Sequence, residues 1–205
     1  MNVLLLIFGS VLLPKVYSLQ CYECLIGAAC SNSQRDCPTG LCGTTRVISY
    51  VGGSKQVDLN IKSCAVAEQC ISGSINFGVA KTVLATKCCS TDLCNNQEPQ
   101  VSSDTSPNGK KCYGCNTENC NAVMECSGTE DRCISALAPG PGGGKQRVKG
   151  CVSKSVCSAL SVKEVAANIG QDVSCCEGNM CNSAGTTAAS LLLLAAPMLS
   201  FALFF

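Results

Sequence analysis

Cysteine is the residue type in this sequence that could do the most chemistry. The chain of 205 residues contains 20 Cys and no His or Trp. Free thiolates bind metals or act as nucleophiles, whereas paired cysteines form disulfides. Without His, the chain can form neither a Ser-His or Cys-His dyad nor a His-ligated metal site. A cysteine content near one in ten is typical of an extracellular disulfide scaffold, so we expect paired cysteines, no metal and no cofactor.

The charge balance and the motifs exclude further classes of function. Fifteen Lys and Arg against fourteen Asp and Glu leave a net charge of +1, so no nucleic-acid partner is expected. The glycine-rich stretch Pro139–Lys145 is not a phosphate-binding P-loop, because Pro139 and Gln146 stand where that motif needs Gly and Ser or Thr. No motif indicates a Ser-Lys or paired-carboxylate site, and we therefore predict that the protein is not an enzyme.

The cysteines form two sets of ten, which indicates an internal repeat. The first set is Cys21, Cys24, Cys30, Cys37, Cys42, Cys64, Cys70, Cys88, Cys89 and Cys94. The second set is Cys112, Cys115, Cys120, Cys126, Cys133, Cys151, Cys157, Cys175, Cys176 and Cys181. From the sixth cysteine onward both sets share the spacing C-x5-C-x17-C-C-x4-C-N, offset by 87 residues (Cys64 to Cys151). The chain is therefore a tandem of two related units.

Disulfides must stabilise each unit, because so short a chain with so few aromatic residues cannot build a large hydrophobic core. Each loop closed by a disulfide contributes about 2–4 kcal/mol. The spacing by itself leaves the connectivity open. A zinc site at each C-x2-C is the alternative, and we disfavour it in a secreted chain without His.

Strand signals dominate the segments that hold the cysteines in place. Segments 44–51 and 56–62 are rich in β-branched residues and flank Gly52-Gly53-Ser54, which predicts a β-hairpin. We expect a second hairpin in 71–87 and a flexible hairpin tip at Pro139–Lys145. Segment 158–174 looks locally helical around 162–167, and we expect its disulfide to limit the helix to a turn or two.

Apolar runs near the two ends of the sequence indicate processing signals. Residues 3–13 form an eleven-residue apolar run that is too short to span a membrane, and small or modest residues follow at Val16 and Ser18. This pattern predicts a signal peptide cleaved after Ser18. Near the other end, small residues at 183–185 precede a short spacer and an apolar tail from Leu191, the pattern of a glycosylphosphatidylinositol (GPI) anchor signal. A short tail-anchored helix is the alternative.

The ten-cysteine unit resembles the lymphocyte antigen 6 / urokinase receptor domain, with C-x2-C near its start and C-C-x4-C-N at its end. The family fold is three β-rich fingers that extend from a disulfide knot. The resemblance implies a small disulfide-rich all-β fold with two tandem three-finger domains. We divide the chain into a signal peptide (1–18), a first repeat (19–97), a linker (98–110), a second repeat (111–183) and a removed anchor propeptide (184–205).

The resemblance also implies a disulfide pairing and roles for three further residues. In the first repeat it pairs Cys21–Cys42, Cys24–Cys30, Cys37–Cys64, Cys70–Cys88 and Cys89–Cys94. In the second it pairs Cys112–Cys133, Cys115–Cys120, Cys126–Cys151, Cys157–Cys175 and Cys176–Cys181. It makes Asn95 and Asn182 structural residues that hydrogen-bond into the knot. Ser183 is then the preferred anchor site, with Asn182 and Gly185 as alternatives.

We therefore expect a non-enzymatic, GPI-anchored protein on the outer leaflet of the plasma membrane that recognises an extracellular protein through its finger loops. Tyr50 and Phe77 are candidate partner contacts, because aromatic residues are enriched in binding hot spots. They could equally fill a small core. Lys145, Arg147 and Lys149 alternate along one strand as a candidate basic edge, or simply form a solvated strand face. The alternative function is a secreted two-domain inhibitor of the phospholipase A2 inhibitor type.

Overall fold

Strands are expected for several segments between the cysteines, and the computed structural model of the chain places most of these segments in strands. The structure describes residues 18–24, 32–38, 40–102, 104–139, 144–160 and 170–183. The predicted signal peptide, apart from Ser18, and the predicted anchor propeptide lie outside the described residues. No helix in the described part of the chain is long and apolar enough to cross a membrane.

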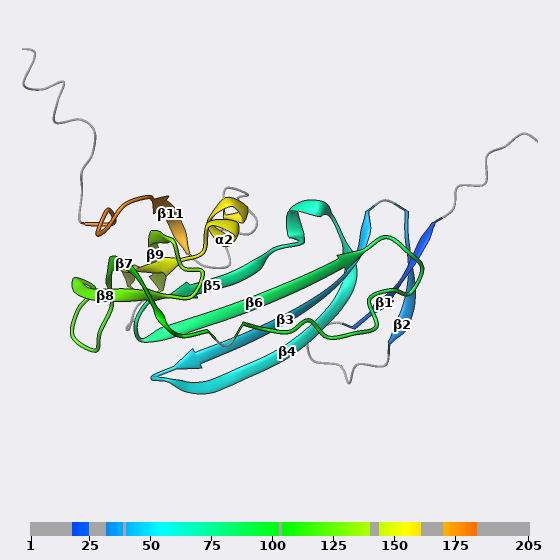
Figure 1. The fold of residues 1–205 in the computed structure, drawn as a ribbon, viewed down its shortest axis with the longest axis horizontal. Coiled ribbons are helices and arrows are strands. Elements are labelled where there is room, and N and C mark those ends of the chain that lie inside the picture. The colour runs from blue at the N-terminus through cyan, green and yellow to red at the C-terminus, as the bar shows by residue number, and fades with distance from the viewer. Residues whose placement is uncertain are drawn as a thin grey trace, which may run out of the picture. The chain divides into compact units, whose positions relative to one another are not determined.

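The strands of the first repeat pair as three hairpins, which can be followed in Figure 1. They are β1 (Leu19–Glu23) with β2 (Ser33–Cys37), β3 (Leu41–Val51) with β4 (Ser54–Ala65), and β5 (Ser72–Asn76) with β6 (Ala80–Cys89). A 3-10 turn, η1 (Ala67–Gln69), precedes the third hairpin. We call these hairpins the first, middle and third fingers of the repeat.

The second repeat follows the same order. Its elements are β7 (Pro107–Gly114), β8 (Ala122–Ser127), β9 (Arg132–Pro139), β10 (Lys145–Val152), α2 (Lys154–Ala159) and β11 (Gln171–Cys176). Strand β7 starts inside the predicted linker. The expected hairpins at 44–62, 71–87 and 134–150 and the all-β fold class are confirmed. The expected helical turn around 162–167 lies outside the described residues.

Helix α2 is an element that the sequence did not predict. The Asp131 carboxylate accepts a hydrogen bond from the Lys154 N–H at 2.8 Å, so a residue distant in the sequence satisfies one of the free donors at the start of the helix. The Ser155 hydroxyl donates to the Ser72 carbonyl at 2.6 Å. Six residues are too few for a helix to be stable alone, so tertiary contacts stabilise this one.

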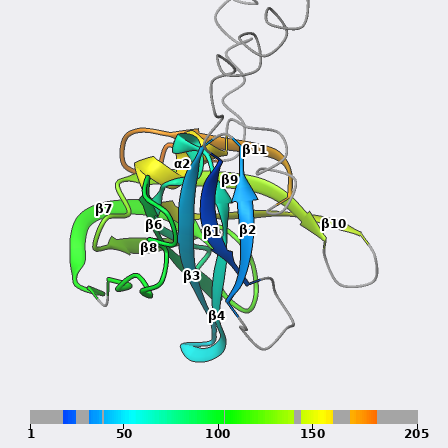
Figure 2. The ribbon, with the colours of Figure 1, turned by 90° about the vertical axis from the view of Figure 1, so that its right-hand side faces the viewer.

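The strands form two pairs and one larger sheet. The pairs β1–β2 and β7–β8 are antiparallel, and Figure 2 shows β1 and β2 side by side. The larger sheet has the order β11-β9-β10-β5-β6-β3-β4. Within it, β5 of the first repeat pairs with β10 of the second through Cys151 opposite Asn76 and Val152 opposite Ile75.

The described residues divide into two compact units that do not coincide with the repeats. The first unit contains the described residues up to Val47, Asp58–Ile71 and Leu84–Val101. The second contains Ile48–Val57, Ser72–Val83 and the described residues from Ser102 onward. The tips of the middle and third fingers of the first repeat therefore belong to the same compact unit as the second repeat.

Disulfide sulfurs occupy the centre of each repeat. Cys21, Cys37 and Cys42 form one buried cluster, and Cys112, Cys126, Cys133 and Cys151 form the other. Nine disulfides join described cysteines, with the same partners as in the pairing implied by the family resemblance. They are Cys21–Cys42, Cys37–Cys64, Cys70–Cys88, Cys89–Cys94, Cys112–Cys133, Cys115–Cys120, Cys126–Cys151, Cys157–Cys175 and Cys176–Cys181. Cys30 lies outside the described residues, so the Cys24–Cys30 pair stays a prediction.

Candidate partner-binding surface

The middle finger is the longest hairpin of the first repeat, and its tip is its most exposed part. Gly52 and Gly53 form the turn with φ of 56° and 80°, which glycine adopts without strain and which suits the twist of a two-residue hairpin. The eight residues of segment 51–58 are all exposed, and the Val51 side chain is 54% exposed. Tyr50 is half-buried beside them.

The third finger of the same repeat supports this tip. The Gly52 N–H donates to the Val79 carbonyl at 3.0 Å, and the hydroxyls of Ser49 and Thr82 lie 3.0 Å apart. Val79 is itself an exposed valine. We call Tyr50, Val51, Lys55, Val57 and Val79 the tip surface. Exposed apolar side chains on a hydrogen-bonded frame are suited to contact another protein with little loss of conformational entropy.

Phe77 lies in a loop that contacts the second repeat. The Cys115 N–H donates to the Phe77 carbonyl at 2.8 Å, and the Phe77 N–H donates to the Ala80 carbonyl at 2.8 Å. The Phe77 side chain is half-buried. Its backbone is therefore held by contacts within the chain, and the Phe77 side chain stays a predicted partner contact outside the tip surface.

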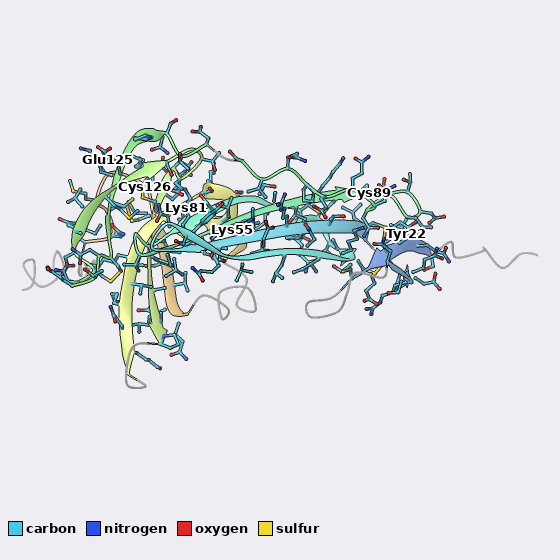
Figure 3. All side chains as sticks on the ribbon, turned by 90° about the horizontal axis from the view of Figure 1, so that it is seen from below. Tyr22, Lys55, Lys81, Cys89, Glu125 and Cys126 are labelled. Carbon is cyan, nitrogen blue, oxygen red and sulfur yellow. A yellow bond between two sulfur atoms is a disulfide. The ribbon has the colours of Figure 1, made fainter. Side chains whose placement is uncertain are left out.

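A buried carboxylate lies where the third finger meets the second repeat. The Glu130 side chain is fully buried, and its Oε1 lies 2.8 Å from the Lys81 ammonium. The same oxygen accepts the Ser74 hydroxyl at 2.8 Å, and Oε2 accepts the Ser127 N–H at 3.0 Å. The Lys81 ammonium also donates to the Ser127 hydroxyl at 2.8 Å, which places Lys81 near Cys126 (Figure 3).

Sequence reasoning missed this cluster. Glu130, Lys81 and Ser74 are ordinary polar residues in β-rich segments, and neither motif nor spacing distinguishes them from solvated residues. The contact depends on which finger meets which repeat, and this information is not local to any of the three segments.

The three basic residues proposed as an exposed edge separate into two environments. Lys145 donates to Gln171 Oε1 at 2.6 Å, and Arg147 pairs with Asp172. Both are exposed, and both of these polar partners lie in β11. Lys149 is only 4% exposed, so it does not belong to an exposed edge with the other two.

Lys149 has a counterpart in the first repeat. Its ammonium lies 5.5 Å from the centre of the Tyr113 ring and donates to Asn121 Oδ1 at 2.9 Å. The Lys62 ammonium lies 5.6 Å from the Tyr22 ring and donates to Asn32 Oδ1 at 2.8 Å. Each lysine stands two residues before the sixth cysteine of its repeat, so the repeat alignment contained the signal for a structural role.

The Asn after the last cysteine of each repeat is buried and hydrogen-bonded. The Asn95 amide donates to the carbonyls of Tyr22 at 2.9 Å and Gly43 at 3.0 Å. The Asn182 amide donates to the carbonyls of Tyr113 and Ile134, each at 2.9 Å. Ser183, the residue that follows, is exposed.

The linker contains an ordered turn. The Ser106 N–H donates to Asp104 Oδ1 at 2.9 Å. The pKa of the Asp104 carboxyl is held below its ordinary value, because hydrogen bonds stabilise the charged form. The main cause is the hydrogen bond from the Ser106 backbone, and the second is the hydrogen bond from the Ser106 side chain.

Two groups of cysteine sulfurs lie as close together as metal ligands do, but their sulfurs are in disulfides. The sulfurs of Cys21, Cys37 and Cys64 lie within 4.8 Å of one another, as do those of Cys112, Cys126 and Cys151. Each of these sulfurs is bonded to another sulfur, and none is a thiolate that could ligate a metal.

A shallow, open depression in the second repeat is lined by polar residues and glycines. Its lining is Asn108, Gly109, Lys110, Gly128, Asp131 and Asn179. Asp131 is its sole carboxylate, and that group is bonded to the Lys154 N–H and lies 3.4 Å from the Arg132 guanidinium. The depression thus offers no acid–base pair or activated nucleophile among the described residues.

Two family models match the chain, one for each repeat. The model of the u-PAR/Ly-6 domain matches residues 17–97. The model of snake toxin and toxin-like proteins matches residues 111–182.

Curated proteins similar to the chain include surface receptors and small frog proteins. The urokinase plasminogen activator surface receptor of Bos taurus is 28% identical over 131 residues, which cover 60% of this chain and 39% of the receptor. The receptor of the same name from Mus musculus is 26% identical over 185 residues, covering 83% of this chain and 56% of the receptor. Xenoxin-2 of Xenopus laevis is 26% identical over 73 residues, covering 36% of this chain and 98% of xenoxin-2. The matches therefore span 39% and 56% of the two receptors and nearly all of xenoxin-2.

Proposed function

Because the chain belongs to the u-PAR/Ly-6 family of three-finger proteins, we propose that it is a non-enzymatic cell-surface protein that binds an extracellular protein. The contact is made by the tip surface of the first repeat. A GPI lipid attached at Ser183 holds the protein to the outer leaflet of the plasma membrane. The similarity to proteins named surface receptors supports this class of function.

The tip surface is the observation that carries the proposal. It combines three exposed valines with a half-buried tyrosine on a hydrogen-bonded hairpin pair. Such a surface binds a partner that offers a complementary apolar patch, because burying apolar side chains there releases water and orders little chain.

Binding is tested with the ectodomain, residues 19–183, screened against a library of secreted and cell-surface proteins. For any protein that it captures, Val51→Asp is expected to weaken binding about tenfold or more, because a carboxylate would then be desolvated in an apolar contact. Val123→Asp is the matched control, since Val123 is 57% exposed in β8 and lies outside the tip surface. Equal affinities of the two variants would locate the binding site elsewhere.

The anchor is tested on intact cells. A phosphatidylinositol-specific phospholipase C is expected to release the protein into the medium, whereas a secreted inhibitor would already be there. Ser183 is exposed and Asn182 is buried, which supports Ser183 as the residue that the transamidase reaches. Ser183→Leu is expected to reduce the surface display, because the transamidase requires a small residue at this site. Unchanged display would move the anchor to Asn182 or Gly185.

A further inference from the structure

We propose that the second repeat carries a strand-recognition surface, whose ligand in this protein is the tip segment of the third finger of the first repeat, Ser72–Val83. Glu130 is the group that selects this ligand. This recognition takes place within the chain and does not depend on the proposed function.

Backbone pairing supplies the general part of the recognition. Strand β5 adds to the edge of β10, and the Ser153 N–H donates to the Ser74 carbonyl at 3.0 Å. The Cys115 N–H donates to the Phe77 carbonyl at 2.8 Å. Adding a strand to an open sheet edge binds through main-chain hydrogen bonds, so it gives affinity with little dependence on side chains.

Close packing between the two backbones excludes any residue larger than glycine at two positions of this interface. A Cβ atom at Gly150 would lie 1.9 Å from the Asn76 carbonyl oxygen, and one at Gly78 would lie 2.2 Å from the Cys115 carbonyl oxygen. Each repeat thus contributes a glycine that lets the two backbones approach. Helix α2 lies beside β5 in Figure 1, and the Ser155 hydroxyl donates to the Ser72 carbonyl.

The buried charge supplies the specificity. Glu130 is fully buried, and a carboxylate in such a place is stable only when a cation and hydrogen-bond donors compensate it. Ser74 and Lys81 are the donors from the third finger, and both contact Oε1 at 2.8 Å. The Lys81 side chain is 20% exposed, so its ammonium reaches Glu130 from the rim of the interface. A finger without these two side chains would leave the carboxylate short of partners.

Amide hydrogen exchange on the full chain tests the proposal, with Ser74, Cys115 and Ser153 as reporters. The Ser74 N–H donates to Ser153 Oγ at 3.0 Å, and the other two donate across the same interface. The Tyr113 N–H, bonded to Asn182, reports on the knot of the second repeat. Lys81→Met is expected to speed exchange at the three reporters about tenfold or more relative to Tyr113, because it leaves a buried carboxylate without its cation.

The double variant Lys81→Met/Glu130→Gln distinguishes recognition by charge from general packing. Removing the carboxylate as well removes the uncompensated charge, so exchange at the reporters is expected to slow to the rate of Glu130→Gln alone. The control is Lys111→Met with Glu125→Gln, an exposed ion pair of the same repeat at 3.4 Å, which is expected to leave the reporters unchanged.

Three results would overturn the proposal. They are no acceleration by Lys81→Met, equal acceleration at Tyr113, or a double variant at least as fast as Lys81→Met. If Lys81→Met does not fold, folding of the double variant Lys81→Met/Glu130→Gln supports the proposal, because removing the carboxylate then restores the fold. A double variant that also fails to fold counts against the proposal.

Discussion

Asn95 closes the first repeat by bonding both backbone groups of Tyr22, 73 residues earlier in the chain. Its Oδ1 accepts the Tyr22 N–H at 2.9 Å, and its Nδ2 donates to the Tyr22 carbonyl at 2.9 Å. Asn182 bonds Tyr113 in the same way in the second repeat. A carboxamide is suited to this position, because it offers an acceptor and a donor side by side.

Replacing Asn95 by Ala is therefore expected to destabilise the protein by about 2 kcal/mol or more. The change removes the Asn95 partner from the part-buried N–H and carbonyl of Tyr22 and from the buried Gly43 carbonyl, and an unsatisfied buried group costs about 1–3 kcal/mol. Urea unfolding with the disulfides intact measures the effect. Asn96→Ala is the control, because the Asn96 side chain is exposed. A stability of Asn95→Ala equal to that of the control would contradict this role.

Lys149→Met is expected to lower the free energy of unfolding by about 1–2 kcal/mol without changing the exposed surface. Methionine retains most of the apolar stem but loses the contact with the Tyr113 ring and the hydrogen bond to Asn121. Lys145→Met, at an exposed position of the same strand, should cost less than half as much. Chemical denaturation of both variants checks the order, and a larger loss for Lys145→Met would refute it.

Gly53 and Gly78 both have positive φ, but only Gly78 is closely packed against another part of the chain. The two glycines have φ of 80° and 88°, so Ala is strained at both, by about 1–2 kcal/mol. A Cβ at Gly53 meets nothing within 4 Å, whereas one at Gly78 meets the Cys115 carbonyl oxygen. Gly78→Ala is thus expected to lower the melting temperature clearly more than Gly53→Ala. Equal shifts in a thermal melt would show that the Gly78 contact is absent in solution.

No described cysteine is free, which predicts that alkylation without prior reduction labels none of them. After reduction, the protein is expected to unfold at ambient temperature, because the cores of both repeats consist largely of disulfide sulfurs. Mass spectrometry counts the labels, and circular dichroism follows the loss of structure. A labelled cysteine in the unreduced protein would contradict full pairing.

The repeat, the fold class and the middle hairpin could be predicted because they depend on local signals. Cysteine spacing is conserved between the two halves of the chain, and Gly52-Gly53 between β-branched runs defines a turn by its own backbone preferences. The structural role of Lys149 was also readable, since Lys62 occupies the same place relative to the cysteines. It was missed because alternation along a strand was read as a face open to solvent.

Helix α2 and the Glu130 cluster could not be predicted. Each depends on a residue supplied from elsewhere in the chain, such as Asp131 for the first turn of α2 and Lys81 for the Glu130 carboxylate. The same limit applies to Phe77, whose sequence context gives no sign that its carbonyl bonds Cys115.

The spacing and number of the 20 cysteines were enough to predict the two repeats and their dependence on disulfides, because spacing and composition are properties of the chain. The folded chain was needed to see that the tip segment of the third finger of the first repeat, Ser72–Val83, belongs to the same compact unit as the second repeat. This packing follows from the pairing of β5 with β10 and from the compensation of the buried Glu130 carboxylate by Lys81. Both contacts depend on which surfaces meet in space.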